Sequence, residues 1–385
     1  MTPRTPAASD RPTTLGRALR PHAKLLAEDT RRHNRALVCQ TLYRGEQISR
    51  ADIARLTGLT RVTVSDLVAD LMEEGLVVET GTRSDTRPGK PATLLRFDPN
   101  AYQVVGLDLS GHTSFRGALM DLRGEVVSDH AVAIGDRTGD DALALALDLA
   151  RTLAERAGRP LLGVGIGSPG VVTTDGVVVT APNLGWRDLD LRQAVAAALG
   201  VATVVGNDAN AAVLAEHSVG AGHGDLMLVR VGHGVGAGLL LGGTPLFGSH
   251  FAAGEIGHVV VGTDGGRPCV CGKVGCLEAW LSVPNLQAQL DTTPGEPDAV
   301  LREAGRRLGV ALAPVVGALD LAEIVLSGPP DLLEGSLVDA TVSTLHDRTM
   351  ADFHGHLAVR MSWLGEDIVV RGAAVMVLSG QLGVS

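Results

Sequence analysis

The sequence predicts an α/β protein in which a small helical head precedes a larger body of two α/β lobes. Two observations support this class. The first hundred residues contain two helix-like runs on either side of Gly58, and the remainder alternates apolar strand-like runs with glycine turns and helix-like segments. The second pattern is typical of mixed α/β lobes rather than of a barrel. We predict a disordered arm at residues 1–24, the head at 25–96 and the body at 97–385.

Composition is that of a globular protein. The 385 residues are 45% hydrophobic and 20% charged, and the 49 glycines suit a turn-rich α/β chain. A glycine, histidine or charge interrupts every long apolar run, and the start MTPRTPAASDRPTT lacks the apolar segment of a signal peptide. We therefore expect no membrane span and a cytoplasmic location.

Charge is unevenly distributed along the chain. The first 100 residues carry 16 Lys and Arg against 12 Asp and Glu, a balance of +4, whereas the remainder carries 17 against 31, a balance of −14. A basic head on an acidic body favours contact between the head and a polyanion. A chance fluctuation on a solvated surface is the alternative.

Residues 49–79 carry the pattern of two short helices joined by a tight turn. Ser49 followed by Asp52 predicts the start of the first helix, and Gly58 predicts its end. Thr60 can cap a second helix whose apolar residues keep helical spacing. Together with the GLVVE segment that follows, the pattern resembles a winged helix-turn-helix, whose second helix reads base edges in the DNA major groove.

This resemblance implies operator DNA as a partner and, because paired half-sites need symmetric readers, a homodimer or higher homo-oligomer. Asp66 fits less well, since it would repel phosphates or accept a hydrogen bond from a cytosine amine. A helical hairpin for dimerisation is the alternative for the two helices. The Arg-Pro-Gly stretch after Glu79 fits a wing and an extended segment of the kind that can lie in a narrow minor groove, and an interdomain linker is the alternative for it. The predicted DNA contacts are Thr60, Arg61, Thr63, Ser65, Arg83, Arg87 and Lys90.

The segment 254–278 concentrates potential metal ligands. It contains His258, Cys269, Cys271 and Cys276, while Cys39 alone lies elsewhere. Three thiols and an imidazole are a donor set of the Cys₃His type, which predicts a structural Zn²⁺ with all four positions filled by protein. A disulfide would leave one thiol unpaired, and nothing marks the chain as secreted. Buried unligated thiols or a redox pair are the alternatives.

From about Val104 to the C-terminus, an ordered series of short motifs resembles the ROK family, an actin-like group of bacterial sugar kinases and sugar-responsive repressors. The resemblance implies a two-lobed actin-like body, with a small lobe at about 100–205 plus the C-terminal end and a large lobe at about 206–370. Order and spacing make the series far more specific than a lone glycine motif. The motifs are GIGSPG, APNLGW, NDANAA, GAGHGD, GHGVGAG, AGEIGH and CVCGKVGCLE.

The resemblance also implies a sugar between the lobes and the residues that contact it. In ROK kinases the Asp of the NDAN motif, here Asp208, is the base for the attacked hydroxyl, and a carboxylate can also simply bind that hydroxyl. A helix N-cap is the alternative role for Asp208. His258 would bind metal through one ring nitrogen and the sugar through the other. The predicted sugar-binding residues are Asn183, Asn207, Asp208, Glu255, His258 and Glu278.

The two glycine turns that hold ATP in the kinases are altered. The kinase patterns DxGGT and GTG are interrupted by His112 and His233, and Pro329 removes a backbone donor near the nucleotide. Phosphate cradles depend on small residues with exposed N–H groups. We therefore expect a repressor with a sugar or sugar-phosphate effector and no catalytic residue. An ATP-dependent hexose or N-acetylhexosamine kinase with a regulatory head, using Asp208 as its catalytic residue, is the alternative.

Overall fold

The structure is a computed structural model. The predicted arm and the predicted DNA contacts Arg83, Arg87 and Lys90 lie outside the residues that it describes. Within those residues, no helix has the length and apolar character needed to cross a membrane. The described residues are 27–45, 47–82, 92–220, 222, 224–262, 266–350 and 357–385.

The N-terminal domain is a winged helix-turn-helix. Ser49 and Asp52 form the capping box that begins the second helix, which ends at Gly58 in the left-handed conformation (φ 71°). Thr60 caps the third helix by accepting a hydrogen bond from the Thr63 N–H (3.2 Å). A small antiparallel sheet, in the order β1-β3-β2, completes the domain. Its elements are α1 (Ala27–Arg44), β1 (Ile48–Ser49), α2 (Arg50–Thr57), α3 (Arg61–Glu73), β2 (Val77–Thr82) and β3 (Thr93–Phe97).

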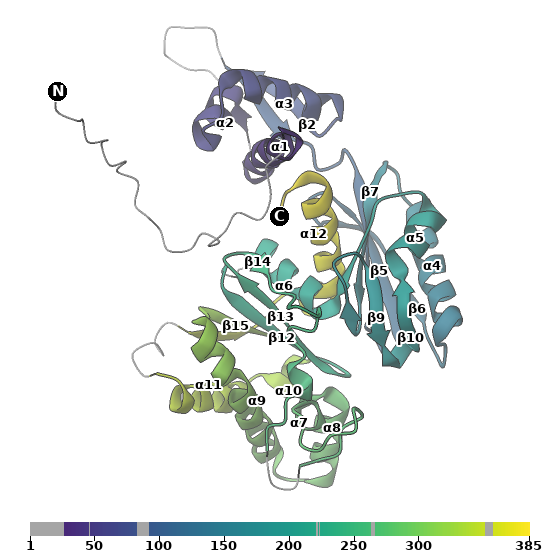
Figure 1. Ribbon diagram of the computed structural model, residues 1–385, viewed down its shortest axis with the longest axis vertical. Helices are drawn as coiled ribbons and strands as arrows, with labels where there is room; N and C mark the ends of the chain where they lie inside the picture. The colour runs from purple at the N-terminus through teal and green to yellow at the C-terminus, as the bar shows by residue number, and fades with distance from the viewer. Residues whose placement is uncertain are drawn as a thin grey trace, which may run out of the picture.

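The first lobe of the body is built on a five-stranded sheet in the order β11-β7-β4-β5-β6. Helices α4 and α5 cover its outer face (Figure 1). Its elements are β4 (Gln103–Asp108), β5 (Ser114–Asp121), β6 (Val126–Ala133), α4 (Gly139–Glu155), β7 (Leu161–Ser168), β8 (Val171–Val172), β9 (Val177–Ala181), η1 (Pro182–Leu184), β10 (Trp186–Asp190), α5 (Leu191–Leu199) and β11 (Thr203–Asn207).

The second lobe is built on a five-stranded sheet in the order β14-β13-β12-β15-β16. Its elements are α6 (Asp208–Ser218), β12 (Leu226–Val231), β13 (Val235–Leu241), β14 (Thr244–Pro245), η2 (Ile256–His258), α7 (Glu278–Leu281), α8 (Val283–Thr292), α9 (Pro297–Leu319), β15 (Glu323–Ser327), α10 (Pro330–Leu333), α11 (Ser336–Arg348), β16 (Ala358–Met361) and η4 (Gly365–Asp367).

The two sheets repeat one topology. In each, three successive strands form an antiparallel meander. A fourth strand then pairs in parallel with the first strand of that meander, and a fifth pairs in parallel with the fourth. The β4–β5 turn and the β12–β13 turn are equivalent, and both lie where the lobes face each other. This duplicated arrangement is the actin-like body expected from the sequence.

Helices α6 and α12 (Ile368–Leu382) lie between the two sheets (Figure 1). Their contacts bring backbone against backbone. A Cβ on Gly165 of β7 would lie 1.9 Å from the Ala373 carbonyl oxygen, and one on Gly372 would lie 1.8 Å from that of Ala211. Glycine is therefore required at both positions, and α12 is held tightly between the first sheet and α6.

The end of α12 also belongs to the winged helix. Leu378 and Leu382 share one buried cluster with Val38 and Leu42 of α1. Beyond the helix, the Gln40 side chain exchanges two hydrogen bonds of 2.9 Å with the Ser385 backbone. The last helix of the two-lobed body is thus part of the core of the N-terminal domain.

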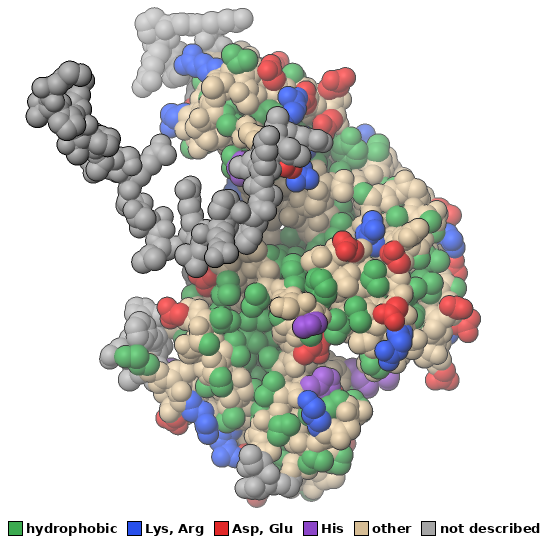
Figure 2. Space-filling model, viewed as in Figure 1, with side chains coloured by type: hydrophobic (Ala, Val, Ile, Leu, Met, Phe, Trp, Pro, Cys, Tyr) green, Lys and Arg blue, Asp and Glu red, His purple; other side chains and the backbone are tan. Residues whose placement is uncertain are grey.

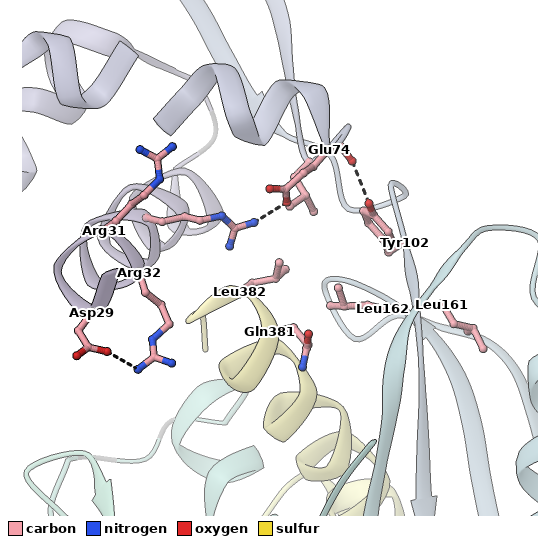
Figure 3. A pocket seen from close by; sticks show the side chains of 11 residues that line it. Asp29, Arg31, Arg32, Glu74, Tyr102, Leu161, Leu162, Gln381 and Leu382 are labelled. Carbon is pink, nitrogen blue, oxygen red and sulfur yellow. Dashed lines mark hydrogen bonds and ion pairs between the residues drawn. The ribbon is translucent and has the colours of Figure 1, made fainter. Parts of the chain in front are cut away.

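A cleft of about 720 Å³ marks this junction, between α1, the end of α12 and β7 (Figure 3). Its charged side chains are paired: Arg31 with Asp70 (2.5 Å), Arg35 with Glu74 (2.5 Å) and Arg32 with Asp29 (3.4 Å). None of the predicted sugar-binding residues lines it. We therefore interpret this cleft as a domain junction, separate from the candidate sugar site.

Candidate functional site

Asn207 and Asp208 lie where β11 ends and α6 begins. Asn207 caps the helix, because its Oδ1 accepts hydrogen bonds from the N–H groups of Ala209 (2.9 Å) and Asn210 (3.1 Å). Its Nδ2 donates to the Gly170 carbonyl (2.9 Å) and to Asp208 Oδ1 (3.0 Å). The capping role considered for Asp208 is thus filled by Asn207, which also orients the Asp208 carboxylate.

An arginine that the sequence analysis did not single out lies against Asp208. Arg230 Nη1 is 2.5 Å from Asp208 Oδ2, and its Nη2 is 3.7 Å from Asp108 Oδ2. Asp108 ends β4 of the first lobe and Arg230 lies in β12 of the second, so the guanidinium links the lobes. The one sequence signal was a charge inside an otherwise apolar strand, LMLVRV.

These three charges are largely buried. The side chains of Asp108, Asp208 and Arg230 are 7%, 15% and 24% exposed. Burial raises the pKa of Asp208, the Arg230 guanidinium opposes this rise, and the Asp108 carboxylate adds to it. An ion pair this short makes Asp208 a weaker proton acceptor than an unpaired buried carboxylate. The carboxylate is nonetheless well placed to accept hydrogen bonds.

Glu255, His258 and Glu278 come from the segment that contains the cysteines. Burial raises the pKa of Glu255, the charge on His258 opposes this, and Asp208 and Glu278 raise it further. The four side chains are therefore close enough to influence one another, and Glu278 Oε1 also lies 3.9 Å from Cys269 Sγ. Glu278 begins α7, and its Oε2 accepts a hydrogen bond from the Val235 N–H (3.1 Å), which anchors it beside the β12–β13 turn.

Asn183 stands apart from the other predicted sugar-binding residues. It lies in η1 with an exposed side chain. Among the described residues, no hydrogen bond or ion pair joins it to Asp208, Glu255 or Glu278. Its role as a sugar contact stays a prediction.

His258, Cys269, Cys271 and Cys276 converge on one point. One ligand atom from each lies within 4.8 Å of the others, which makes the group a candidate metal site. Cys269 Sγ is 3.7 Å from His258 Nδ1, and Cys271 Sγ is 3.7 Å from Cys276 Sγ. The thiol pair is too far apart for a disulfide, whose S–S bond is about 2.05 Å. A tetrahedral site with metal–sulfur bonds of about 2.3 Å would separate two sulfurs by about 3.8 Å, so the donor set fits a metal ion.

The equivalent turns of the two lobes meet through their histidines. The rings of His112 and His233 stack with centroids 3.8 Å apart and planes 9° apart. Figure 2 shows histidine side chains gathered where the two lobes face each other. His233 is an exposed residue, and partial desolvation of its ring lowers its pKa, His112 lowers it further and Glu278 opposes the shift. Bulky rings therefore fill the turns that the sequence analysis compared with phosphate cradles.

The exposed face of α3 carries most of the predicted DNA contacts that the structure describes. Val64, Leu67, Val68 and Leu71 are buried, which fixes the rotation of the helix. Arg61 and Ser65 are exposed, whereas Thr63 is half-buried and its hydroxyl lies 2.9 Å from that of the capping Thr60. The structure thus presents these side chains at the N-terminal half of the helix.

The duplicated two-lobed body and the winged helix-turn-helix together define an actin-like protein with an N-terminal domain of a DNA-binding type. The chain belongs to the ROK family: the family model described as "ROK family" matches residues 104–379. A second model, described as "MarR family", matches residues 40–88, which include α2 and α3.

Individual relatives fall into two groups. A putative xylose repressor of Caldicellulosiruptor sp. (strain Rt8B.4) is 29% identical over 387 residues, covering 91% of this chain and 96% of the relative. The solved structure of a ROK family transcriptional regulator, a homologue of the Escherichia coli MLC protein, is 25% identical with a TM-score of 0.80 and covers 92% of this chain and 97% of its own. A ROK family glucokinase from Streptomyces griseus, solved with glucose and AMPPNP, is 26% identical with a TM-score of 0.63 and covers 71% and 98%. These two regulators each cover more than nine tenths of this chain, whereas the glucokinase structure covers 71% of it.

Proposed function

We propose that this chain is a sugar-responsive transcriptional repressor whose ROK domain binds a sugar effector and whose winged helix binds operator DNA. The observation that carries the proposal is the shared core of α12 and the winged helix, in which Leu378 and Leu382 belong to the same buried cluster as Val38 and Leu42. It joins a two-lobed ligand-binding fold directly to a DNA-binding motif. The relatives that span nearly the whole chain, a putative xylose repressor and a ROK transcriptional regulator, support the same reading.

The sugar is proposed to bind between the lobes, where several acceptors and donors converge. Asp208, Glu255 and Glu278 would accept hydrogen bonds from hydroxyls, and His258 and Arg230 would donate. Asn207 orients Asp208, and we propose that Asn183 contacts the sugar from the first lobe. Because carboxylates outnumber cations around this space, an unphosphorylated sugar fits better than a sugar phosphate.

The metal site is proposed to hold a structural Zn²⁺. The ligands would be His258, Cys269, Cys271 and Cys276, which together fill a tetrahedral site and leave no open position for water. His258 Nδ1 faces Cys269, which leaves Nε2 for a sugar hydroxyl. The metal would therefore set the position of one sugar contact and would supply no chemistry of its own.

Catalysis is not part of the proposed function. A base must take a proton from the sugar hydroxyl, and Asp208 is already paired with the permanent cation of Arg230. The two turns that would cradle ATP phosphates instead hold the stacked His112 and His233. Both observations support binding without phosphoryl transfer.

Sugar binding would control DNA through the relative position of the lobes. A ligand that binds one lobe arrangement better shifts the population toward it, and DNA and sugar affinities are then coupled reciprocally. Helix α12 lies between the lobes and ends in the winged-helix core, so it is the proposed path. We further propose a homodimer or higher homo-oligomer that reads paired half-sites, and a cytoplasmic location.

The proposed DNA contacts remain those of the sequence analysis. Thr60, Arg61, Thr63 and Ser65 belong to the described part of α3 and its cap, and Arg83, Arg87 and Lys90 follow β2. Arginine and lysine would bind phosphates, and the hydroxyls would bind phosphates or base edges. DNA binding should weaken steeply as salt concentration rises.

Glu255→Ala tests the sugar site. We expect the variant to bind operator DNA as wild type does and to lose its response to the inducing sugar, because one charged acceptor is removed from the space around Asp208. The measurement is DNA binding by mobility shift with and without each member of a sugar panel. Glu155→Ala, which removes an exposed carboxylate at the end of α4, is the matched control. An unchanged sugar response in Glu255→Ala would refute the site.

The retained Asp108 and Asp208 favour a sugar kinase as the second candidate. A coupled ADP-release assay across hexoses and N-acetylhexosamines separates the two functions. Turnover by wild type that disappears in Asp208→Asn would establish the kinase and overturn the non-enzymatic reading.

A further inference from the structure

The outward face of α3 has an unusual chemistry for a helix that meets DNA. Val62 and Asp66 lie two residues before and after the buried Val64, which turns each of them about 160° away from it around the helix. The Val62 side chain is 71% exposed, and Asp66 is also exposed. The centre of this face therefore presents a methyl surface and a carboxylate, while Arg61 lies to one side.

Asp66 is also not engaged elsewhere in the fold. Two other acidic groups near the end of α3, Asp70 and Glu74, pair with Arg31 and Arg35 of α1. In the part of the chain that the structure describes, no hydrogen bond or ion pair is made by the Asp66 side chain. A carboxylate that faces DNA without a cation repels phosphates, so it needs a hydrogen-bond donor on a base edge.

We propose that Val62 and Asp66 are the base-reading pair of this protein, with Val62 contacting the 5-methyl group of a thymine and Asp66 accepting a hydrogen bond from the N4 amine of a cytosine. In the major groove only thymine offers a methyl group, and Asp pairs with the cytosine amine. The two residues are four positions apart, a rise of about 6 Å along the helix, which spans one to two base-pair steps of about 3.4 Å. This inference rests on the proposed binding of operator DNA.

The test begins with selection of duplexes from a random library by the full-length protein. Each thymine of the selected site is then replaced by deoxyuridine, which removes only the methyl group, and affinity is measured by fluorescence anisotropy. Wild type should bind about three- to fivefold more weakly at one thymine per half-site, the effect of losing one buried methyl contact. Val62→Ala should bind the thymine and uracil duplexes equally. It should fold normally, since the side chain is exposed.

Asp66→Asn provides the second arm. Selection with this variant should replace a cytosine within two base pairs of that thymine by adenine, because an amide pairs with adenine N6 and N7. Leu56→Ala is the matched control: this leucine of α2 is 62% exposed, and its loss should leave both preferences unchanged. The proposal fails if wild type ignores every methyl group, or if Val62→Ala still distinguishes thymine from uracil. Failure to select any sequence, with no salt-dependent binding, would instead refute DNA binding itself and this readout with it.

Discussion

In the first lobe, β4 ends in Asp108 and the following turn carries His112; in the second, β12 contains Arg230 and the following turn carries His233. The histidines stack on each other, and the arginine reaches both Asp108 and Asp208. The two equivalent turns therefore each carry a histidine, and beside them an aspartate of the first lobe faces an arginine of the second. This arrangement connects the lobes through polar contacts, which can be exchanged for ligand contacts more readily than a packed apolar core can.

The junction with the winged helix is built differently. There, Leu378 and Leu382 of α12 are buried in one apolar cluster with residues of α1, and backbone contacts through Gly372 hold the same helix against α6. Tightly packed interiors transmit displacement rather than absorb it. The lobe–lobe contact is thus the part of the molecule suited to respond, and α12 is the part suited to convey the response.

The largest expected effect comes from breaking the charge contact between the lobes. Arg230→Ala would leave Asp108 and Asp208 buried without their cation, so we expect the free energy of unfolding to fall by about 3–5 kcal/mol. Urea denaturation measures this loss. Arg151→Ala, which removes an exposed partner of Asp148, should cost at most about 1 kcal/mol.

A triple variant distinguishes charge from packing at the same site. Adding Asp108→Asn and Asp208→Asn to Arg230→Ala neutralises both carboxylates, so much of the lost stability should return. A triple variant as unstable as Arg230→Ala alone would show that the arginine acts by filling space.

Metal removal should have an intermediate effect, confined to the second lobe. The segment with the candidate metal site follows β14 and carries Glu255 and His258, so losing the ion would release two proposed sugar contacts at once. We expect sugar affinity to fall roughly tenfold to a hundredfold. Calorimetric titration of a responsive sugar before chelation, after chelation and after Zn²⁺ is restored measures this change.

DNA binding is the control for metal removal. The winged helix packs on α12 and the first lobe, whereas the cysteine segment belongs to the second lobe. The affinity for operator DNA without sugar should therefore persist after chelation and in Cys269→Ser. Loss of DNA binding in parallel with sugar binding would contradict this division between the lobes.

The features that the sequence predicts correctly depend on residues that are close together in the chain. The capping box of Ser49 and Asp52 and the spacing around Gly58 are local signals, and the structure contains both. The cysteines are clustered within one short segment, and they converge as expected. The ordered motifs then identified the two-lobed fold, because each lies at a turn or helix start that the fold requires.

Contacts between the lobes could not be predicted from the sequence in the same way. Arg230 reaches Asp108 from a strand of the other sheet, and no local period relates the two positions. The stacking of His112 on His233 depends on how two equivalent turns face each other. Even the division of roles between Asn207 and Asp208 required knowing which side chain caps α6. Tertiary placement of polar groups decides each case, and sequence spacing does not encode it.

The smallest expected effect concerns the stacked histidines and pH. Partial desolvation of the ring and the neighbouring His112 lower the pKa of His233, with Glu278 opposing, so the fold disfavours the protonated ring. Its contribution to stability is therefore present above the unfolded pKa of about 6.5 and is lost as pH falls through the lowered folded value. Wild type should lose on the order of 1 °C more in Tm between pH 7.5 and 5.5 than His112→Asn, in which the second imidazole is absent. His250→Asn, an exposed histidine outside the contact, should behave as wild type. Identical pH dependence in wild type and His112→Asn would mean that the rings stack without sensing each other's charge, leaving Arg230 as the electrostatic link between the lobes.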